Sequence, residues 1–207
     1  LMYTTSTSPS VFIGEQSTSL VWYNVDDSSS VDTVHRVDIE LVGGDINDRI
    51  LKSEEVKRIT NYYFPDNSKG IIGNRSYSRI IRKNIYPNID QHFYSNSDGF
   101  KMYFVVNSGG NYEDIKLKFN GGDVELTPNG GIKVKSIIGE LVFDKAIVYN
   151  VNSAGNNVPM PPSGTIIDLG NNEYGISLQN YPLARPLIIQ LQQTPLTRGV
   201  GNAEWCT

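Results

Sequence analysis

The chain alternates apolar and polar positions in short runs, which clusters of Gly, Asn, Asp and Ser separate. The clearest run is residues 35–42, where Val37, Ile39 and Leu41 alternate with charged residues before two glycines. A period of two is typical of a β-strand with one buried and one exposed face. Similar runs occur at residues 11–13, 20–23, 89–94, 100–106, 115–119, 124–126, 132–134, 165–169, 174–178 and 187–191. Together they predict an antiparallel, all-β protein.

The turn sequences between runs predict which strands pair. Hairpins are expected around residues 14–17, 96–99 and 170–172, each rich in turn-forming residues. The clusters at 120–123 and 128–131 predict a meander that joins the runs at 115–119, 124–126 and 132–134. Residues 137–138 are expected to pair with a long strand at 141–151 across Gly139-Glu140, and 187–191 is expected to be the last strand.

Only residues 53–59 favour a helix, because they lack glycine and space Val56 and Ile59 three apart. Such a segment supports one or two turns at most. The predicted fold class is therefore an antiparallel β-sandwich or an open, barrel-like pair of sheets with hairpin meanders and at most one short helix. We expect residues 1–191 to form a single β domain and residues 192–207 to be a C-terminal linker. The proline-containing loop 152–164 is either a long hairpin connection or a division between two lobes, and we favour the single domain.

Charge and cysteine content exclude several classes of function. The net charge is −4 and the 18 Lys and Arg residues are scattered, which is unlike a nucleic-acid-binding protein. No stretch approaches 18 consecutive apolar residues, so no membrane-spanning segment is expected. The single cysteine, Cys206, allows neither an internal disulfide nor a cysteine-based zinc site.

The two histidines leave few ways to build a catalytic site. His92 lies two residues after Asp90 on a predicted strand, so both side chains should point to one face, as a base and its orienting carboxylate must. A polar pair on the solvent face of a strand is the more ordinary interpretation, since the sequence connects no nucleophile to it. A hydrolase with an Asp90/His92 pair therefore remains only an alternative.

Two acidic clusters could offer oxygen ligands to calcium. One is Asp26-Asp27, and the other comprises Asp45, Asn47 and Asp48. Neither has the spacing of an EF-hand loop, and such residues more commonly satisfy the backbone of turns. We therefore expect no bound metal and no cofactor.

Tyrosines are concentrated in the middle of the chain. An exposed row of them could stack on sugar rings or contact a protein partner, whereas packing within the sheets is the ordinary alternative. The candidates for such a binding surface are Tyr62, Tyr63, Tyr77, Tyr86 and Tyr94.

An ordered series of short motifs gives the chain a family resemblance. Tyr-Pro-Asn-Ile-Asp at 86–90, Asn-Tyr-Tyr-Phe at 61–64 and Ala-Arg-Pro-Leu-Ile-Ile at 184–189 are among them. Over residues 34–191 the chain resembles a domain of unknown function that precedes SBBP-type β-propeller repeats in secreted and cell-surface bacterial proteins, many from Bacteroidota. Its last four residues, 204–207, resemble the start of a first repeat. The motif positions with a structural role in this resemblance are Asn61, Tyr62, Phe64, Tyr86, Pro87, Ile89, Asp90, Tyr94 and Pro186.

The chain departs from the family pattern at four motif positions. Asn88 replaces a glycine and can adopt the positive φ that this position favours. Gln91 and His92 replace apolar residues, which indicates that this strand faces water. Gln190 replaces an aspartate.

The resemblance implies an extracellular or cell-surface location, type IX secretion and adhesion, with the protein's own downstream repeats as partners. It implies no catalytic site. We therefore expect a noncatalytic structural or adhesion module positioned before a repeat array, and no enzyme. Binding of a surface glycan or peptide through exposed tyrosines is the first alternative, and the hydrolase is the second.

Overall fold

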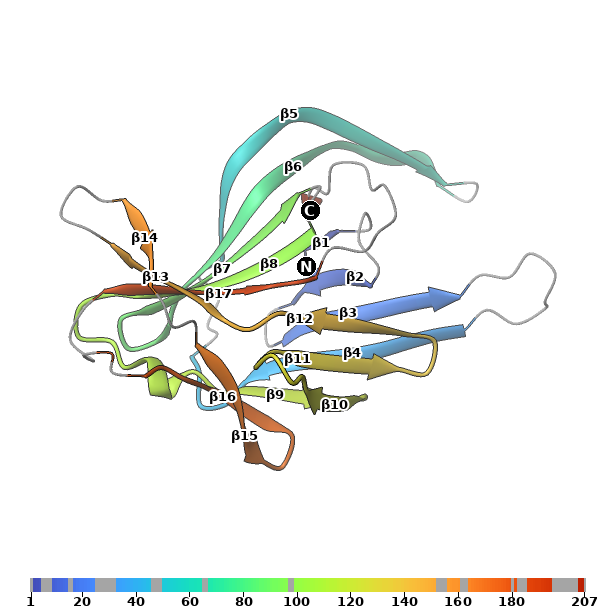
Figure 1. Ribbon diagram of the computed structural model, residues 1–207. Coiled ribbons are helices and arrows are strands. Elements are labelled where there is room, and N and C mark those ends of the chain that lie inside the picture. Colours follow the sequence, from blue (N-terminus) through green and yellow to red (C-terminus); the bar gives the residue numbers. More distant parts are fainter. Residues whose placement is uncertain are drawn as a thin grey trace.

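The computed structural model describes residues 2–4, 9–14, 17–24, 33–45, 50–64, 67–96, 99–151, 156–160, 164–179, 181, 186–194 and 205–206. It is built almost entirely from strands (Figure 1). One 3₁₀ turn, η1 (Tyr112–Asp114), is the helical structure within the described residues. The strands are β1 (Met2–Thr4), β2 (Ser10–Ile13), β3 (Ser17–Asn24), β4 (Thr33–Leu41), β5 (Ile50–Phe64), β6 (Asn67–Tyr86), β7 (Ile89–Asn96), β8 (Gly99–Val106), β9 (Leu117–Asn120), β10 (Asp123–Leu126), β11 (Ile132–Ser136), β12 (Gly139–Phe143), β13 (Ile147–Val151), β14 (Asn157–Pro159), β15 (Thr165–Gly170), β16 (Glu173–Ser177), β17 (Leu187–Gln192) and β18 (Trp205–Cys206).

These strands form one long antiparallel sheet and one small sheet. The long sheet runs β14-β13-β17-β8-β7-β6-β18-β1-β2-β3-β4-β9-β16-β15, with β5 paired to β6. It is open, since its path starts at β14 and ends at β15. The small sheet runs β10-β11-β12. The predicted all-β, sandwich-like fold class is confirmed.

The long sheet divides into two halves where its strands are shortest. Between β6 and β2 it continues only through β18 and β1, which have two and three residues. We call β5, β6, β7, β8, β17, β13 and β14 the β6 half, and β2, β3, β4, β9, β16 and β15 the β3 half. The small sheet packs on the β3 half, because a side chain at Gly139 of β12 would collide with the Trp22 ring of β3.

One apolar core joins both halves and the small sheet. Phe93 and Phe100 stack within the β6 half at 6.2 Å between ring centroids. Phe100 also meets Phe143 of the small sheet edge to face at 6.1 Å. In the β3 half, Phe119 and Tyr174 pack edge to face at 5.6 Å. Burial of these large rings, which come from the β6 half, the β3 half and the small sheet, is the main source of stability.

Several sequence-based predictions are confirmed. In β4, Val37, Ile39 and Leu41 are buried, as the alternation predicts. The hairpins β2–β3, β7–β8, β10–β11 and β15–β16 form around the expected turns. Each of these pairs joins strands that follow each other directly, so local alternation and turn chemistry were sufficient to predict them.

The helix predicted at residues 53–59 is wrong. These residues belong to β5, which forms a long hairpin with β6 (Figure 1). Ile59 is exposed, so no apolar helix face is buried here. A helix of one or two turns makes few hydrogen bonds, whereas pairing with β6 gives this segment cross-strand partners.

The meander predicted across residues 115–134 is wrong in its first pairing. Strand β9 pairs with β4 and β16, while β10 starts the small sheet with β11. The chain crosses between the two sheets at Gly121 and Gly122. A Cβ atom at Gly122 would lie 2.6 Å from the Lys135 oxygen and from Val37 Cγ2, so only glycine permits this crossing.

Two strand boundaries near residue 140 also differ from the prediction. Residues 137–138 form the tight turn that joins β11 to β12, since Ser136 pairs with Gly139. The expected strand at 141–151 is two strands, with β12 in the small sheet and β13 in the long sheet. Strand β17 is not the last, because Trp205 and Cys206 pair with β6 and β1. The division at residue 191 stays a prediction.

The expectation that β7 faces water at Gln91 and His92 is wrong for Gln91. Gln91 is buried on the core side and accepts a hydrogen bond from Arg82 at 3.2 Å. His92 points to the opposite face and is half-buried. Asn88 has a φ of 59°, the left-handed conformation expected of it.

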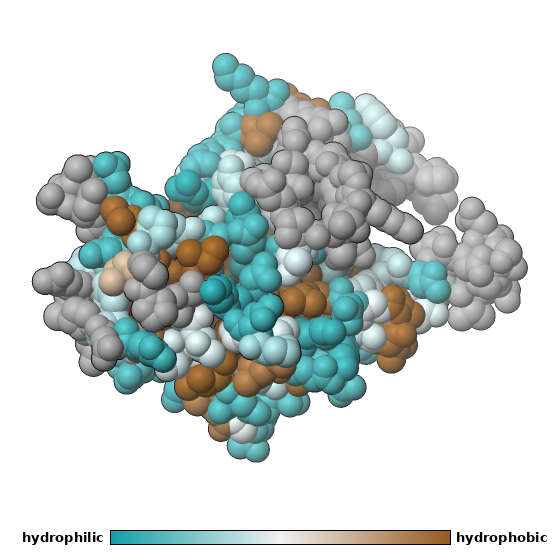
Figure 2. All heavy atoms as spheres, viewed as in Figure 1, coloured by the Kyte–Doolittle hydropathy of each residue, from teal (hydrophilic) through white to brown (hydrophobic). Residues whose placement is uncertain are grey.

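On the face shown in Figure 2, apolar side chains form separate groups among hydrophilic ones rather than a continuous patch. Such scattered groups are normal for a protein surface. A search of the described residues finds no helix able to span a membrane.

Candidate functional site

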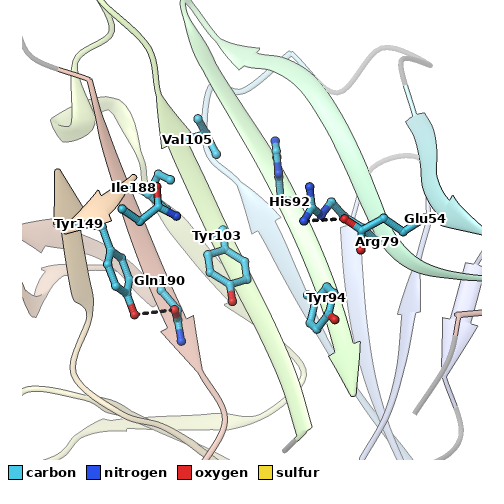
Figure 3. Close-up of a pocket in the computed structure, with 10 residues that line it drawn as sticks. Glu54, Arg79, His92, Tyr94, Tyr103, Val105, Tyr149, Ile188 and Gln190 are labelled. Carbon is cyan, nitrogen blue, oxygen red and sulfur yellow. Dashed lines mark hydrogen bonds and ion pairs between the residues drawn. The ribbon is translucent and has the colours of Figure 1, made fainter. Parts of the chain in front are cut away.

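The outward face of the β6 half carries a cavity of about 570 Å³. We call it the tyrosine pocket. The described residues that line it are Glu54, Arg79, His92, Tyr94, Tyr103, Val105, Tyr149, Asn157, Ile188 and Gln190 (Figure 3). The volume lies within the roughly 300–1,000 Å³ that is usual for small-ligand sites.

Strand register brings these residues together. His92 lies opposite Tyr103, and Tyr103 lies opposite Gln190, so one row of side chains crosses β7, β8 and β17. A second row joins Ile188 and Tyr149 across β17 and β13. Because side chains alternate between faces, the neighbouring residues of the same strands point into the core, as Phe93, Met102, Phe104 and Ile189 do. The pocket therefore lies on the outer face of strands whose other face packs into the core.

Three tyrosines supply most of the aromatic surface. Figure 3 shows Tyr103 near the middle of the pocket, between Tyr149 and Tyr94. Burial raises the pKa of Tyr103, and the neighbouring phenols of Tyr149 and Tyr94 raise it further. The Tyr103 hydroxyl therefore stays protonated and can donate a hydrogen bond to a ligand.

Gln190 is held in place by hydrogen bonds on both sides of its amide. The Tyr149 hydroxyl donates to Gln190 Oε1 at 3.1 Å, and Gln190 Nε2 donates to Gln192 Oε1 at 2.7 Å. This amide occupies the position where the resemblance gives an aspartate. The pocket therefore has a neutral polar group here.

An ion pair lies on the opposite side of the pocket. Arg79 Nη2 and Glu54 Oε1 are 2.7 Å apart. The Ser78 hydroxyl donates to Glu54 Oε2 at 2.9 Å. Glu54 has a φ of 59°, which is unusual for a residue with a side chain. Such strain costs about 1–3 kcal/mol and is concentrated at functional positions.

His92 is uncharged at neutral pH. Burial lowers the pKa of His92 to about 4, although the Asp90 carboxylate acts in the opposite direction. Its Nε2 atom is buried and has no hydrogen-bond partner among the described residues. His92 therefore adds no charge to the pocket at neutral pH.

Asp90 and His92 share a face, as predicted, but Asp90 is already engaged. Its carboxylate accepts hydrogen bonds from Lys83 Nζ at 2.7 Å and from the Asn84 amide at 2.8 Å. Burial raises the pKa of Asp90, but these two hydrogen bonds outweigh it and hold the pKa below its usual value. In the described structure Asp90 is thus bound to Lys83 and Asn84 rather than to His92.

Of the proposed tyrosines whose side chains are described, Tyr94 lines the pocket and the others lie elsewhere. The candidacy of Tyr86 is wrong, because Tyr86 is buried and its hydroxyl donates to the Val42 carbonyl at 3.0 Å. Tyr63 is exposed on the β5–β6 hairpin. The ring of Tyr77 lies 5.6 Å from the Lys52 ammonium on that hairpin. The side chain of Tyr62 lies outside the described part of the structure.

The proposed calcium ligands lie largely outside the described residues. This holds for Asp26, Asp27, Asn47 and Asp48. Asp45 is described, and its backbone amide donates to the Ile85 carbonyl at 2.7 Å. A search of the described residues finds no group of three or more His, Cys, Asp or Glu that could hold a metal ion.

The remaining motif residues support the fold. Ile89 is buried, and Asn61 Oδ1 accepts a hydrogen bond from the Gly73 amide at 2.9 Å. Pro87 is exposed in the turn between β6 and β7, while Pro186 is exposed just before β17 and its carbonyl accepts from the Tyr181 hydroxyl at 3.2 Å. The side chain of Phe64 is not described.

Sequence reasoning missed most of the pocket. Tyr103 could have been found, because the turn after β7 fixes the register that places it opposite His92. Tyr149 and Gln190 could not, since they depend on pairing between β13 and β17, which are distant along the chain. Glu54 and Arg79 were missed because the sequence predicted a helix at residues 53–59, where the structure has a strand paired with β6.

Comparisons with known proteins identify a family but no activity. The model of the family described as Domain of unknown function (DUF7948) matches residues 2–190 of the 207. No curated protein and no solved structure shows significant similarity to the chain. Because the match spans most of its length, the chain belongs to this family of domains of unknown function.

Proposed function

We propose that this domain is a noncatalytic carbohydrate-binding module and that its ligand lies in the tyrosine pocket. The single observation that carries the proposal is the convergence of Tyr94, Tyr103 and Tyr149 in one cavity whose polar groups are uncharged or paired. Sugars present apolar C–H faces and hydroxyl rims. Aromatic rings pack against the former, and oriented amides, phenols and imidazoles bind the latter.

The charge state of the pocket favours a hydroxyl-rich ligand over a strongly charged one. Arg79 is neutralised by Glu54, and His92 is neutral because burial lowers its pKa to about 4. Gln190 and Asn157 add neutral amide groups. A peptide would also meet aromatic and amide groups here, so peptide binding is the competing outcome.

The same residues argue against hydrolysis. Glycoside hydrolysis commonly uses two carboxyl groups that flank the scissile bond. Glu54 is the single carboxylate among the described lining residues, and it is paired with Arg79. These residues also include no Ser, Thr or Cys nucleophile next to His92. Binding without chemistry therefore fits the pocket best.

The resemblance to domains that precede SBBP-type repeats supports a proposal for where the module lies in the cell and which domains are next to it. We place the module in a secreted or cell-surface bacterial protein, of Bacteroidota type and exported by type IX secretion. There it would serve adhesion next to its own downstream repeats. Deleting the module from the parent protein should leave export intact and abolish glycan-dependent adhesion.

The binding proposal is tested by Tyr103→Ala on a glycan array and by titration of the strongest hit. We expect at least a tenfold loss of affinity, because the central ring of the pocket is removed. Tyr63→Ala is the matched control, since Tyr63 is exposed on the β5–β6 hairpin and does not line the pocket.

Two results would overturn the proposal. One is a glycan array on which the wild type gives no hits, and hits in a peptide library would then identify peptide binding as the alternative. The other is equal loss of glycan binding in Tyr103→Ala and Tyr63→Ala, which would place the site elsewhere.

A further inference from the structure

We infer that Glu54 sets the charge preference of the tyrosine pocket, so that the pocket takes uncharged sugars and rejects uronic acids. The inference rests on the proposed function, because it names the class of sugar that the same pocket would take. It starts from three features of one residue: its strained backbone, its ion pair with Arg79 and its place at the pocket wall.

The backbone at Glu54 is held in an unfavourable conformation by its contacts. Its neighbours Ser53 and Glu55 pair with Arg79 and Tyr77 of β6, so Glu54 lies between two paired positions of the hairpin. A residue with a side chain rarely adopts a φ of 59° there. Such strain persists only where surrounding contacts fix it, and the Ser78 hydroxyl and the Arg79 guanidinium supply those contacts.

The ion pair with Glu54 occupies Arg79, the cationic side chain to which a ligand carboxylate could otherwise bind. Arg79 is the only Arg or Lys among the described lining residues. A free guanidinium forms a fork that matches a carboxylate, so an unpaired arginine here would favour uronic acids. With Glu54 Oε1 at 2.7 Å, a ligand carboxylate would have to displace Glu54 and remain next to its negative charge. The repulsion between the Glu54 carboxylate and a ligand carboxylate would therefore strongly lower the affinity for acidic sugars.

Glu54 also offers a favourable contact to a neutral sugar. Its side chain is 44% exposed and lines the pocket, so a ligand can reach it. A sugar hydroxyl that donates to a carboxylate forms a charge-assisted hydrogen bond, which is stronger than a neutral one. Glu54 therefore favours neutral sugars, because it accepts hydrogen bonds from their hydroxyls. It disfavours uronic acids, because its negative charge repels their carboxylates.

The test compares Glu54→Gln with Glu55→Gln in the full 207-residue chain. Glu55 is the matched control, because it is the next residue of β5 and pairs with Arg75 at 2.7 Å but does not line the pocket. The probes are matched oligomers that differ at C6 in carrying a hydroxyl or a carboxylate: galactose and galacturonate, glucose and glucuronate, mannose and mannuronate. Affinities for each pair are measured for the wild type and both variants.

We expect the wild type to bind at least one neutral oligomer about tenfold more tightly than its acidic counterpart. Glu54→Gln should lower affinity for the neutral oligomer and raise affinity for the acidic one, so that the ratio falls about tenfold or more. Glu55→Gln should leave the ratio unchanged.

The inference is overturned if Glu54→Gln keeps the wild-type ratio while the wild type still binds glycans, and the proposed function then stands. It is also overturned if the wild type prefers the acidic oligomers. If no glycan on the full array binds the wild type, the proposed function itself has failed, and the inference fails with it.

Discussion

His92 is a half-buried titratable side chain of the tyrosine pocket, and its environment makes the stability of the fold depend on pH. Burial lowers its pKa to about 4, and the positive charges of Arg79 and Lys83 add to this, against the pull of Asp90. In the unfolded chain histidine titrates near its ordinary pKa of about 6.5. The folded protein therefore binds fewer protons than the unfolded chain between these two values, and its stability rises with pH in that window.

We expect the free energy of unfolding to be lower at about pH 5 than at about pH 7.5. Stability is fully present above the unfolded pKa of about 6.5 and is lost as the pH falls toward 4, because unfolding then takes up a proton. Urea denaturation at both pH values measures the difference. His92→Gln, which cannot titrate, should show a smaller decline. An equal decline in the variant would show that another group is responsible.

At the scale of elements, the passage from β9 to β10 decides which sheet each strand joins. Gly122 lies between the two sheets, where a Cβ atom would be 2.6 Å from the Lys135 carbonyl oxygen and from Val37 Cγ2. Backbone atoms cannot yield as the end of a long side chain can. The close approach that forms the sandwich therefore depends on the absence of a side chain at this position.

Gly122→Ala should destabilise the protein by about 1–3 kcal/mol, the usual effect of forcing extra atoms into packed space. Thermal and urea unfolding measure this change. Gly14→Ala is the control, because the one contact its Cβ would make with the described residues is to the Ser17 carbonyl oxygen at an ordinary 3.5 Å. We expect a change within about 0.5 kcal/mol for the control. Similar losses in both variants would contradict the steric explanation.

At the scale of the whole molecule, Arg82 connects the two halves of the long sheet where the strands between them are shortest. From β6 its Nη2 atom donates to the carbonyl oxygens of Gly14 and Ser17, which flank the β2–β3 turn. Its Nη1 atom donates to Gln91, and its guanidinium lies 5.2 Å from the centroid of the Phe93 ring. Burial lowers the pKa of Arg82 to about 10, so it stays charged at neutral pH.

Arg82→Met should lower the free energy of unfolding by roughly 1.5–3 kcal/mol, because it leaves partly buried carbonyl groups without their charged donor. Arg75→Met is the comparison. Arg75 forms an exposed ion pair with Glu55, and such pairs contribute about 0–1 kcal/mol. Urea denaturation gives both values, and hydrogen exchange should show faster opening in β2 and β3 of Arg82→Met. Equal effects of the two substitutions would mean that Arg82 does not connect the halves.

The predictable part of this fold is local. Alternation at Val37, Ile39 and Leu41 gave a correct strand and its buried face, and turns such as 96–99 gave correct hairpins. Alternation alone could not show that residues 53–59 form a strand, since Val56 and Ile59 fit a helical spacing equally well. It also could not show that β9 and β10 separate, because a glycine turn between two runs looks the same in a hairpin and in a crossing.

The candidate site shows the same division. Asp90 and His92 were correctly placed on one face because they are two residues apart on one strand. Their partnership was not predictable, since Lys83 and Asn84, which bind Asp90, come from the preceding strand through its own register. The tyrosine pocket combines residues from seven strands, and most of these residues are far apart along the chain.

The sequence by itself determined the all-β class, the direct hairpins and the resemblance to a domain of unknown function, because each depends on periodicity, turn residues or ordered local motifs. The tertiary structure decided the two-sheet division, the buried charge of Arg82 and the site formed by Tyr103, Tyr149, Gln190 and the Glu54–Arg79 pair. These features depend on contacts between distant segments. Sequence patterns record which face of a strand is buried, but they do not record which strands become neighbours.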